Sequence, residues 1–175
     1  FWTFIALIKQ NETLFNFVYS KALNQIKDFD ENDVSRIKNV FLNSFYDGIQ
    51  ATTIEQATEM QTKINEDYNN GNSIHWGIVD KLTNKIVGTC GYYRGLDKGE
   101  GELGCVLLPQ YRGHGYMTFA ILLAIEFGLD NIGLKRIWAV TTKQNEKAIK
   151  LVEKLNFIKI ADLDDDDVEY ELSRD

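Results

Sequence analysis

Proline is almost absent from this sequence: Pro109 is the only one among 175 residues. No Ser/Gly/Pro-rich linker and no repeat of about 20–50 residues interrupts the chain, so we predict one domain over residues 21–175. Residues 1–20 are predicted to be an N-terminal extension of unclear role. The two cysteines and two histidines lack the spacing of a zinc site, and we predict no metal. We expect Cys90 and Cys105 to be buried, reduced thiols.

Long apolar runs are missing as well. No segment approaches the ~20 apolar residues that a membrane-spanning helix needs. The apolar opening, residues 1–8, is short and lacks the basic start and the cleavage site of a signal peptide. These absences predict a cytoplasmic protein that does not bind membranes.

Positive charge is in short supply, with 19 Lys and Arg against 26 Asp and Glu, which gives a net charge of -7. Nucleic-acid phosphates require Lys and Arg to replace their counterions, so a nucleic-acid partner is not expected. The acidic balance fits a cationic partner instead. Hydrophobic residues make up 44% of the chain, which is enough for an ordered core.

Apolar periodicity predicts helices in the first part of the chain, after a first strand over residues 24–29. One helix begins near Asp30 or Asn32, with a stripe of Val34, Ile37, Phe41 and Phe45. Thr53 and Gln56 form a capping box for a second helix, which Gly71 ends. Its apolar stripe is Ile54, Ala57, Ile64 and Tyr68.

The second part of the chain predicts an antiparallel meander followed by alternating strands and helices. Short β-rich runs span residues 76–79, 86–92 and 102–108, and turn residues separate them. A largely apolar, buried helix then reaches about Leu129, and a strand at 136–141, a helix at 145–155 and a hairpin of 157–161 with 168–172 follow. Asn156 is expected in a left-handed cap. The order predicts an α+β (mixed α/β) fold with helices on both faces of the sheet.

The strongest local signal is the turn from Leu108 to Tyr116 between a strand and the long helix. Glycines allow close backbone approach to a ligand, and the first amides of a helix are unpaired. A pyrophosphate could therefore bind the amides of Gly113, His114 and Gly115, with added charge from Arg112. A turn that binds nothing stays an alternative. A P-loop is excluded because no Gly-Lys-Ser/Thr follows, and the dinucleotide-binding spacing is absent.

Gln110-x-x-Gly113-x-Gly115 resembles the Q/R-x-x-G-x-G/A motif of the GNAT N-acetyltransferases. The string from Glu102 to Tyr116 is similar to the branch that contains the ribosomal-protein-serine/alanine N-terminal acetyltransferases. Residues 134–137 and 145–157 resemble further motifs of this branch. The resemblance implies a mixed, mostly antiparallel sheet of about six to seven strands, splayed in the middle between residues 102–108 and 136–141.

The resemblance also implies that acetyl-CoA binds as co-substrate. Its pantetheine arm would enter the splay, and an amide near Val106 or Leu107 would hold the oxyanion of a tetrahedral intermediate. Asn145 would contact the arm. The implied cofactor-binding residues are Val106, Leu107, Leu108, Gln110, Arg112, Gly113, His114, Gly115, Tyr116, Met117 and Asn145.

The implied reaction is direct acetyl transfer to a primary amine, either a peptide or protein N-terminal α-amine or a small amine. Glu102 is the candidate general base, acting through a water, and a strand-end glutamate in solvent or in a salt bridge is the alternative. Relatives use a tyrosine or a serine as the general acid, and Val152 and Ala148 stand at those positions here. Tyr92, Tyr93 or a water could protonate the thiolate instead.

Further interpretations concern the cysteine and histidine side chains, the acidic run, and the alternative function. A nucleophilic role for Cys105 is disfavoured, and His75 and His114 are expected to be structural. The acidic run Asp162–Asp167 is predicted to be a hairpin tip near the acceptor entrance that attracts cationic acceptors. A catalytically silent acyl-CoA-binding module is the alternative function, and the chain is expected to be a monomer or a homodimer.

Overall fold

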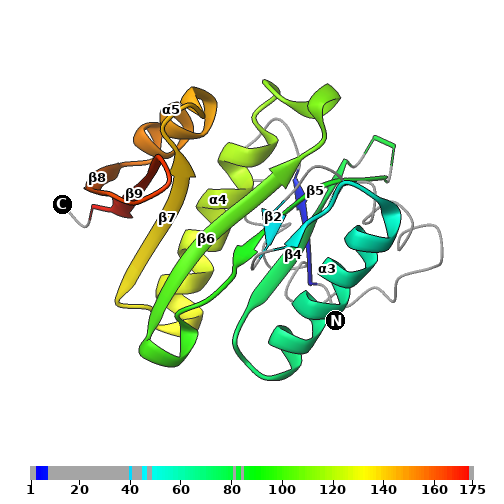
Figure 1. The fold of residues 1–175 in the computed structure, drawn as a ribbon, viewed down its shortest axis with the longest axis horizontal. Helices are drawn as coiled ribbons and strands as arrows, with labels where there is room; N and C mark the ends of the chain where they lie inside the picture. The colour runs from blue at the N-terminus through cyan, green and yellow to red at the C-terminus, as the bar shows by residue number, and fades with distance from the viewer. Residues whose placement is uncertain are drawn as a thin grey trace.

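The structure, a computed structural model, describes residues 3–7, 40, 45–46, 49–80, 82–83 and 85–173. These residues form a mixed sheet with helices on both faces (Figure 1). The strands of the main sheet lie in the order β1-β4-β5-β6-β7-β9-β8. Their bounds are β1 Thr3–Leu7, β4 Ile74–Asp80, β5 Lys85–Tyr92, β6 Glu100–Leu107, β7 Arg136–Thr142, β8 Phe157–Asp162 and β9 Asp167–Leu172.

Helices and several short elements connect these strands in the described part of the chain. The helices are α3 Ile54–Asn69, α4 Tyr116–Glu126 and α5 Glu146–Lys154. The segment Phe127–Ile132 continues α4 as a π-helix, and short 3₁₀ turns span Leu96–Lys98 and Pro109–Tyr111. Two short strands, β2 Phe45–Tyr46 and β3 Ile49–Gln50, pair with each other outside the main sheet.

The predicted meander and strand–helix alternation are confirmed. β4, β5 and β6 pair antiparallel, as do β7, β9 and β8. β1 runs parallel to β4, and β6 runs parallel to β7, so the sheet is mixed and mostly antiparallel. The predicted extension over residues 1–20 thus contributes β1 to the main sheet, and its other residues lie outside those described.

The predictions for the first helices have different outcomes. The strand predicted at 24–29 lies outside the described residues, and of the first helix only Val40 is described as helical. Phe45 was expected on that helix, but it belongs to β2 and pairs with Gln50. The capping box at Thr53 is present, but Ile54 is exposed, because the buried stripe of α3 is Ala57, Met60 and Ile64.

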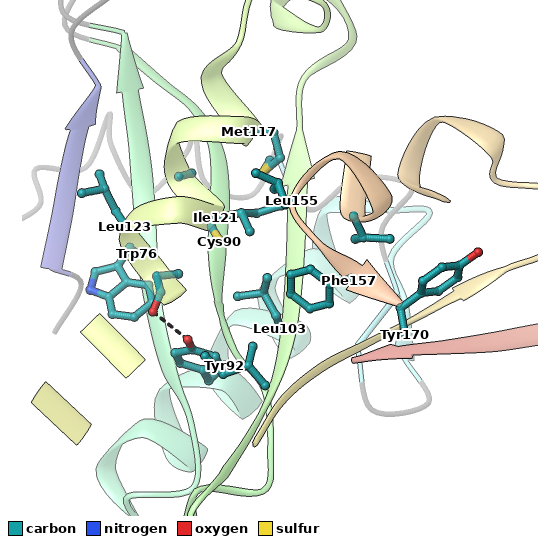
Figure 2. Packing of buried hydrophobic residues seen from close by; sticks show 14 of the residues in the cluster. Trp76, Cys90, Tyr92, Leu103, Met117, Ile121, Leu123, Leu155, Phe157 and Tyr170 are labelled. Atoms are coloured by element: carbon teal, nitrogen blue, oxygen red, sulfur yellow. Dashed lines mark hydrogen bonds between the residues drawn. The ribbon is translucent and has the colours of Figure 1, made fainter. Parts of the chain in front are cut away.

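Two apolar clusters hold the layers together, one on each face of the sheet. The larger packs α4 and α5 against the sheet, and Figure 2 shows part of it, including Leu103, Ile121 and Phe157. The smaller packs α3 through Ala57, Met60 and Ile64. Side chains alternate along a strand, so Leu103 and Leu107 of β6 face α4 while Val106 faces the α3 side.

Tyr92 explains the change from α-helix to π-helix after Glu126. Its hydroxyl is buried and donates a hydrogen bond of 2.6 Å to the carbonyl of Ala124 (Figure 2). A Cβ at Gly128 would lie 2.3 Å from the Tyr92 hydroxyl oxygen, so only glycine fits there. Most of the long helix is buried or partly buried, as expected, and Phe119 and Leu122 are exposed.

β6 and β7 separate soon after they meet, which confirms the predicted splay. Their parallel register pairs Glu100 with Arg136, Gly101 with Ile137 and Glu102 with Trp138. The remaining residues of β6 pair with β5 and not with β7. In Figure 1 the two strands diverge toward the end at which α4 begins. The sheet thus consists of two halves, β1-β4-β5-β6 and β7-β9-β8, which meet over three residue pairs.

Candidate active site

The glycine turn lies at the open end of the gap between β6 and β7. Gly113 and Gly115 have φ angles of 77° and 85°, in the left-handed region that glycine tolerates. Gly115 is the N-cap of α4 and makes no side-chain cap bond, and no acidic residue occupies the first turn. The first amides of α4 have no carbonyl partner within the helix, so this turn has the character of an anion site.

The predicted cofactor residues of the turn differ in exposure. Gln110, Arg112, Gly113 and His114 are exposed, and Gly115 and Tyr116 are partly buried. The side chain of Met117 is buried in the larger cluster, so only its amide can face a ligand. Arg112 donates from Nε to the carbonyl of Leu107 at 3.3 Å, which connects the turn to the end of β6.

A second connection holds the start of α4 against the sheet. The Tyr116 hydroxyl donates to Oδ1 of Asp80 at 3.0 Å, at the end of β4. Asp80 also accepts a hydrogen bond of 2.6 Å from the Thr83 hydroxyl, which lowers the pKa of its carboxyl. The ring of Tyr111 lies edge-on to Tyr116, 6.0 Å between centroids. Sequence analysis did not find this connection, because Asp80 and Tyr116 are 36 residues apart.

The register of β6 decides which of its peptide groups face the gap. Tyr93 donates to the carbonyl of Glu102, and Leu108 donates to the carbonyl of Val87. Hydrogen-bonded and non-hydrogen-bonded pairs alternate in an antiparallel ladder, so the amide of Val106 faces β5. The peptide groups of Cys105 and Leu107, which lie beyond the last pair with β7, face the gap. Of the two amides predicted for the oxyanion, that of Leu107 has the matching direction.

Asn145 and the two positions expected to carry a general acid lie on α5. Asn145 is the N-cap, and its Oδ1 accepts from the amide of Ala148 at 3.2 Å. Val152 is buried in the larger cluster. Tyr92 cannot replace the missing acid, because it is buried and bonded to Ala124, and burial raises the pKa of its hydroxyl well above the ordinary range.

Glu102 lies at the closed end of the gap, where β6 and β7 still pair. One carboxylate oxygen, Oε2, is 2.7 Å from Nε of Arg94, and the Glu102 side chain is 15% exposed. Burial raises the pKa of this carboxyl, the charge of Arg94 lowers it, and the charge of Glu169 raises it; the net direction is upward. A partly buried carboxylate with a raised pKa can accept a proton near neutral pH.

Tyr93 and His75 lie on the same face of the sheet as Glu102. A Cβ at Gly104 would lie 2.0 Å from the ring of Tyr93, so glycine leaves room for that ring. The ring of His75 stands edge-on to Tyr93, with 4.5 Å between centroids. Burial lowers the pKa of His75 to about 3, so the imidazole is neutral at neutral pH. This fits the structural role predicted for His75.

Cys90 and Cys105 are register partners on β5 and β6, and they differ in exposure. Cys90 is buried, as predicted, but Cys105 is exposed, so the prediction of two buried thiols was wrong. The reason is the splay, since no β7 residue pairs with Cys105. Desolvation by the surrounding protein raises the pKa of the Cys105 thiol to about 11, which makes it a poor nucleophile at neutral pH.

Comparison with known proteins agrees with this geometry. Residues 26–158 match the acetyltransferase (GNAT) domain family. The chain belongs to the GNAT acetyltransferase family. It is therefore an acyltransferase, and the GNAT fold predicted from the glycine turn and its downstream motifs is confirmed.

Individual relatives of this GNAT chain include both uncharacterized and named enzymes. It is 29% identical over 139 residues to the uncharacterized N-acetyltransferase YoaA of Bacillus subtilis (strain 168), covering 78% of each chain. It is 36% identical over 56 residues to the spermidine N(1)-acetyltransferase of Escherichia coli (strain K12), covering 32% of this chain and 30% of that enzyme. The ribosomal-protein-S5-alanine acetyltransferase of Vibrio fischeri has a similar fold, with a TM-score of 0.65, 22% identity and coverage of 85% and 92%.

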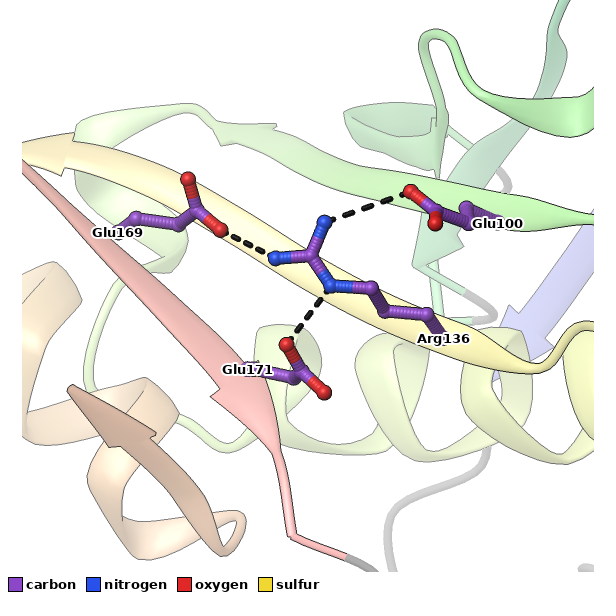
Figure 3. Close-up of polar contacts among 4 residues, drawn as sticks. All are labelled: Glu100, Arg136, Glu169 and Glu171. Carbon is purple, nitrogen blue, oxygen red and sulfur yellow. Dashed lines mark hydrogen bonds and ion pairs between the residues drawn. The ribbon is translucent and has the colours of Figure 1, made fainter. Parts of the chain in front are cut away.

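A cluster of charged side chains in this GNAT chain joins the two halves of its sheet (Figure 3). Arg136, at the start of β7, binds Glu100 of β6 through Nη1 at 3.3 Å. Its Nη2 and Nε bind Glu169 and Glu171 of β9, the latter at 2.7 Å. The guanidinium carbon also lies 5.4 Å from the ring centroid of Trp138. One guanidinium thus faces three carboxylates, which leaves a local excess of negative charge close to Glu102.

The acidic run Asp162–Asp167 lies at the other end of β9. The register pairs Thr142 with Asp167 and Trp138 with Glu171, so the hairpin tip is four residues, roughly 13 Å, along the sheet from the level of Glu102. Lys143 and Lys159 both pair with Asp162. The tip therefore lies at the end of β7 nearest α5, and the carboxylates close to Glu102 are Glu100, Glu169 and Glu171.

Sequence analysis missed Arg94 and the cluster around Arg136. A weak signal was present, because Glu169 and Glu171 are two residues apart in a predicted strand and so share one face. Their partners come from other strands and leave no local pattern. In the described part of this GNAT chain no group of three His, Cys, Asp or Glu side chains is arranged to hold a metal ion. Within the same residues, no helix has the length and apolar character that crossing a bilayer requires.

Proposed function

We propose that this GNAT enzyme transfers an acetyl group directly from acetyl-CoA to a primary amine. The observation that carries the proposal is the separation of β6 from β7 after three residue pairs. It leaves the peptide groups of Cys105 and Leu107 facing a gap with an anion-binding turn at one end and Glu102 at the other. Such a gap suits an extended, amide-containing arm with a diphosphate at its end.

The residues present fit acetyl-CoA. The amides from Gly113 to Met117 would bind the pyrophosphate, and the positive φ of Gly113 and Gly115 keeps side chains out of that space. Among the residues that the structure describes, no atom lies within 4 Å of a Cβ built at Gly113. Leu108 and Gln110 shape the approach to the turn, and His114 would contribute its amide. Asn145 would border the arm from the start of α5.

Acetyl-CoA supplies an activated thioester carbonyl when it is bound. The amine nitrogen attacks this carbonyl, a C–N bond forms and the C–S bond breaks. Glu102 takes the proton that the amine must lose, directly or through one water, and the upward direction of its pKa supports this role. The Leu107 amide is directed to stabilise the carbonyl oxygen as negative charge develops on it.

The departing thiolate does not need a dedicated acid. A thiol with a pKa near ~8.5 leaves readily as an anion, and water can protonate it afterwards. Tyr93 is the remaining tyrosine candidate, since it lies on the same face of the sheet as Glu102. Tyr92 is excluded by its burial and its bond to Ala124.

The acceptor is proposed to be a cationic amine. The three carboxylates around Arg136 lie next to Glu102 and would favour a positively charged molecule. One relative is a spermidine N(1)-acetyltransferase, and one structural neighbour is a ribosomal-protein-S5-alanine acetyltransferase. Polyamines and peptides with a free α-amine are thus the two acceptor classes to test first.

An acceptor screen that measures free CoA tests the proposal. Acetyl-CoA is incubated with the enzyme and with spermidine, alanine- and serine-initiated peptides, or aminoglycosides. We expect turnover with at least one class. A protein that binds acetyl-CoA in a calorimeter and acetylates none of them would be the silent acyl-CoA-binding module that the missing general acid also allows.

Cys105 offers a direct test of the gap. Its exposed thiol and the buried thiol of Cys90 are register partners, so Cys90 is an internal control. We expect iodoacetamide to modify Cys105 slowly at alkaline pH, and acetyl-CoA to protect it. Modification of Cys105 at an unchanged rate under saturating acetyl-CoA would refute the proposed path of the arm.

A further inference from the structure

Strand pairing between the two halves of the sheet is short. Between β6 and β7 the register gives three residue pairs, whereas β7 and β9 share five. Beyond Glu102 and Trp138 the strands part, so these three pairs fix where the gap begins. A polar interaction that crosses from one half to the other at this point would act on the geometry of the gap, together with the larger apolar cluster, which contains residues of both halves.

Arg136 provides that interaction. Its guanidinium reaches Glu100 on the first half of the sheet, while Glu169 and Glu171 hold it from β9 on the second half (Figure 3). Each of three guanidinium nitrogens has a carboxylate of its own, and the Arg136 side chain is 28% exposed. Strong hydrogen bonding by these carboxylates raises the pKa of Arg136 further, so the residue stays charged.

We propose that Arg136 is a positioning residue that clamps the two half-sheets where β6 and β7 separate, and thereby sets the gap and the charge around Glu102. The proposal rests on the proposed function, because the gap matters for transfer only if the thioester lies in it. Arginine suits this position because its planar fork holds three carboxylates at fixed angles. A lysine would supply the charge without the fork.

The clamp also acts on Glu102 through Glu169. The carboxylate of Glu169 raises the pKa of Glu102, and Arg136 binds that same carboxylate. The arginine thus moderates the repulsion between the two glutamates. The charged groups near Glu102 come from each neighbouring strand and from the loop after β5: Arg94, Glu100, Arg136, Glu169 and Glu171.

Two measurements on the free protein test the clamp without any acceptor. Amide hydrogen exchange follows the three pairs between Glu100–Glu102 and Arg136–Trp138. The pKa of Glu102 is followed by NMR of ¹³C-labelled glutamate carboxyls, with Glu102→Gln to assign the signal. We expect Arg136→Gln to accelerate exchange at these pairs by about tenfold and to raise the pKa of Glu102. Arg136→Lys should restore the pKa but not the protection.

Glu169→Gln should shift the pKa of Glu102 in the opposite direction. It also provides a test if Arg136→Gln does not fold. It leaves Arg136 bound to Glu100 and Glu171 and removes a negative charge near Glu102, so the pKa of Glu102 should fall. Glu146→Gln removes an exposed ion pair with Lys150 on α5 and should change neither readout. Unchanged exchange in Arg136→Gln, or an unchanged Glu102 pKa in Glu169→Gln, overturns the proposal.

The pH profile of kcat/KM, with spermidine and a serine-initiated peptide as probe acceptors, connects the clamp to transfer. The acid limb should move to lower pH in Glu169→Gln and to higher pH in Arg136→Gln. In Arg136→Lys the limb should return toward that of the wild type, while kcat stays reduced by on the order of 10- to 100-fold, because the gap is misaligned. A wild-type enzyme that is inactive with every acceptor would refute the proposed function. The two measurements on the free protein would still test whether Arg136 holds the two half-sheets together.

Discussion

The two ends of the gap between β6 and β7 are built in different ways. The open end is the glycine turn, which is formed by nine consecutive residues, Leu108–Tyr116, and by the start of one helix. The closed end is formed by Glu102, Arg94 and the Arg136 clamp, which come from three strands and a loop. A short sequence motif can thus encode the proposed binding site for the pyrophosphate of acetyl-CoA. The proposed general base, in contrast, acquires its surroundings only when the sheet is assembled.

This difference predicts that acetyl-CoA binding and acetyl transfer can be changed independently by substitutions. Variants at the open end should weaken acetyl-CoA binding, and variants at the closed end should slow transfer at unchanged acetyl-CoA affinity. The four predictions below test this separation, from the largest effect to the smallest.

Glu102→Gln should lower kcat by about 10²- to 10⁴-fold, because the amine loses its proton acceptor. In the wild type, kcat/KM should fall as the pH drops through the raised pKa of Glu102, since the protonated carboxyl cannot act as a base. This acid limb should disappear in the variant. Steady-state CoA release gives kcat, and calorimetry should find acetyl-CoA affinity within about twofold of wild type. A large loss of acetyl-CoA affinity in this variant would contradict the assignment of binding and transfer to different ends of the gap.

Gly113→Ala should weaken acetyl-CoA binding by about tenfold, because the methyl group points into the space proposed for the phosphates. Gly133→Ala is a matched control at the other end of α4. The φ angles are 77° and 76°, and no atom of the described part of the chain lies within 4 Å of a Cβ built at either glycine. Both variants should lose about 1 kcal/mol of stability from left-handed strain, measured by urea unfolding. Equal acetyl-CoA affinities in the two variants would contradict the role of the turn.

Tyr116→Phe should weaken acetyl-CoA binding by about threefold and cost about 1 kcal/mol of stability, because α4 loses its hydrogen bond to Asp80. Asp80 has a lowered pKa in the folded protein, so its contribution to stability is present above the ordinary carboxyl range and is lost as pH falls through that lowered value.

Urea unfolding at several pH values measures this dependence. Asp80→Asn keeps an acceptor for Tyr116 and should flatten the loss of stability at acid pH. An equally steep acid loss in Asp80→Asn would assign that loss to other carboxyls.

Neutralising the hairpin tip should have the smallest effect. Asp164→Asn with Asp165→Asn removes two exposed charges that lie at the far end of β9 from Glu102. Asparagine tolerates the left-handed backbone of Asp165, whose φ is 59°, so the turn is kept. The acceptor KM should change by less than about twofold even at low salt. A salt-dependent rise of KM would support the attraction of cationic acceptors by the tip and place the acceptor nearer to it.

The parts of the fold that sequence predicted depend on neighbouring residues. The capping box at Thr53, the left-handed Asn156 and the alternation of strands and helices each follow from a few adjacent residues. Glu102 was selected by a family motif, and its burial follows from the sheet. The charged cluster beside Glu102 could not be predicted, because Arg136 and Glu169 are separated by 33 residues and meet only when β7 and β9 pair.

Errors at single residues have a similar origin. Ile54 has the right spacing for the buried face of α3, but it is the first residue of the helix and is exposed. Cys105 lies on a strand whose apolar residues predict burial, yet the missing pairing with β7 exposes it. In both cases the local pattern predicts the correct helix or strand. The exposure of the side chain depends on the neighbouring element, which the local sequence does not specify.

The hydrogen bond from Tyr92 to Ala124 also limits the alkaline tolerance of this enzyme. Both the Tyr92 hydroxyl and the Cys90 thiol are buried, and burial raises the pKa of each in the folded state. In the unfolded chain they ionise at their ordinary pKa values, near ~8.5 for the thiol and ~10 for the phenol. The stability that they contribute is therefore complete below that range and declines above it. A protein stored or assayed in strongly basic buffer should therefore lose stability as these two groups ionise.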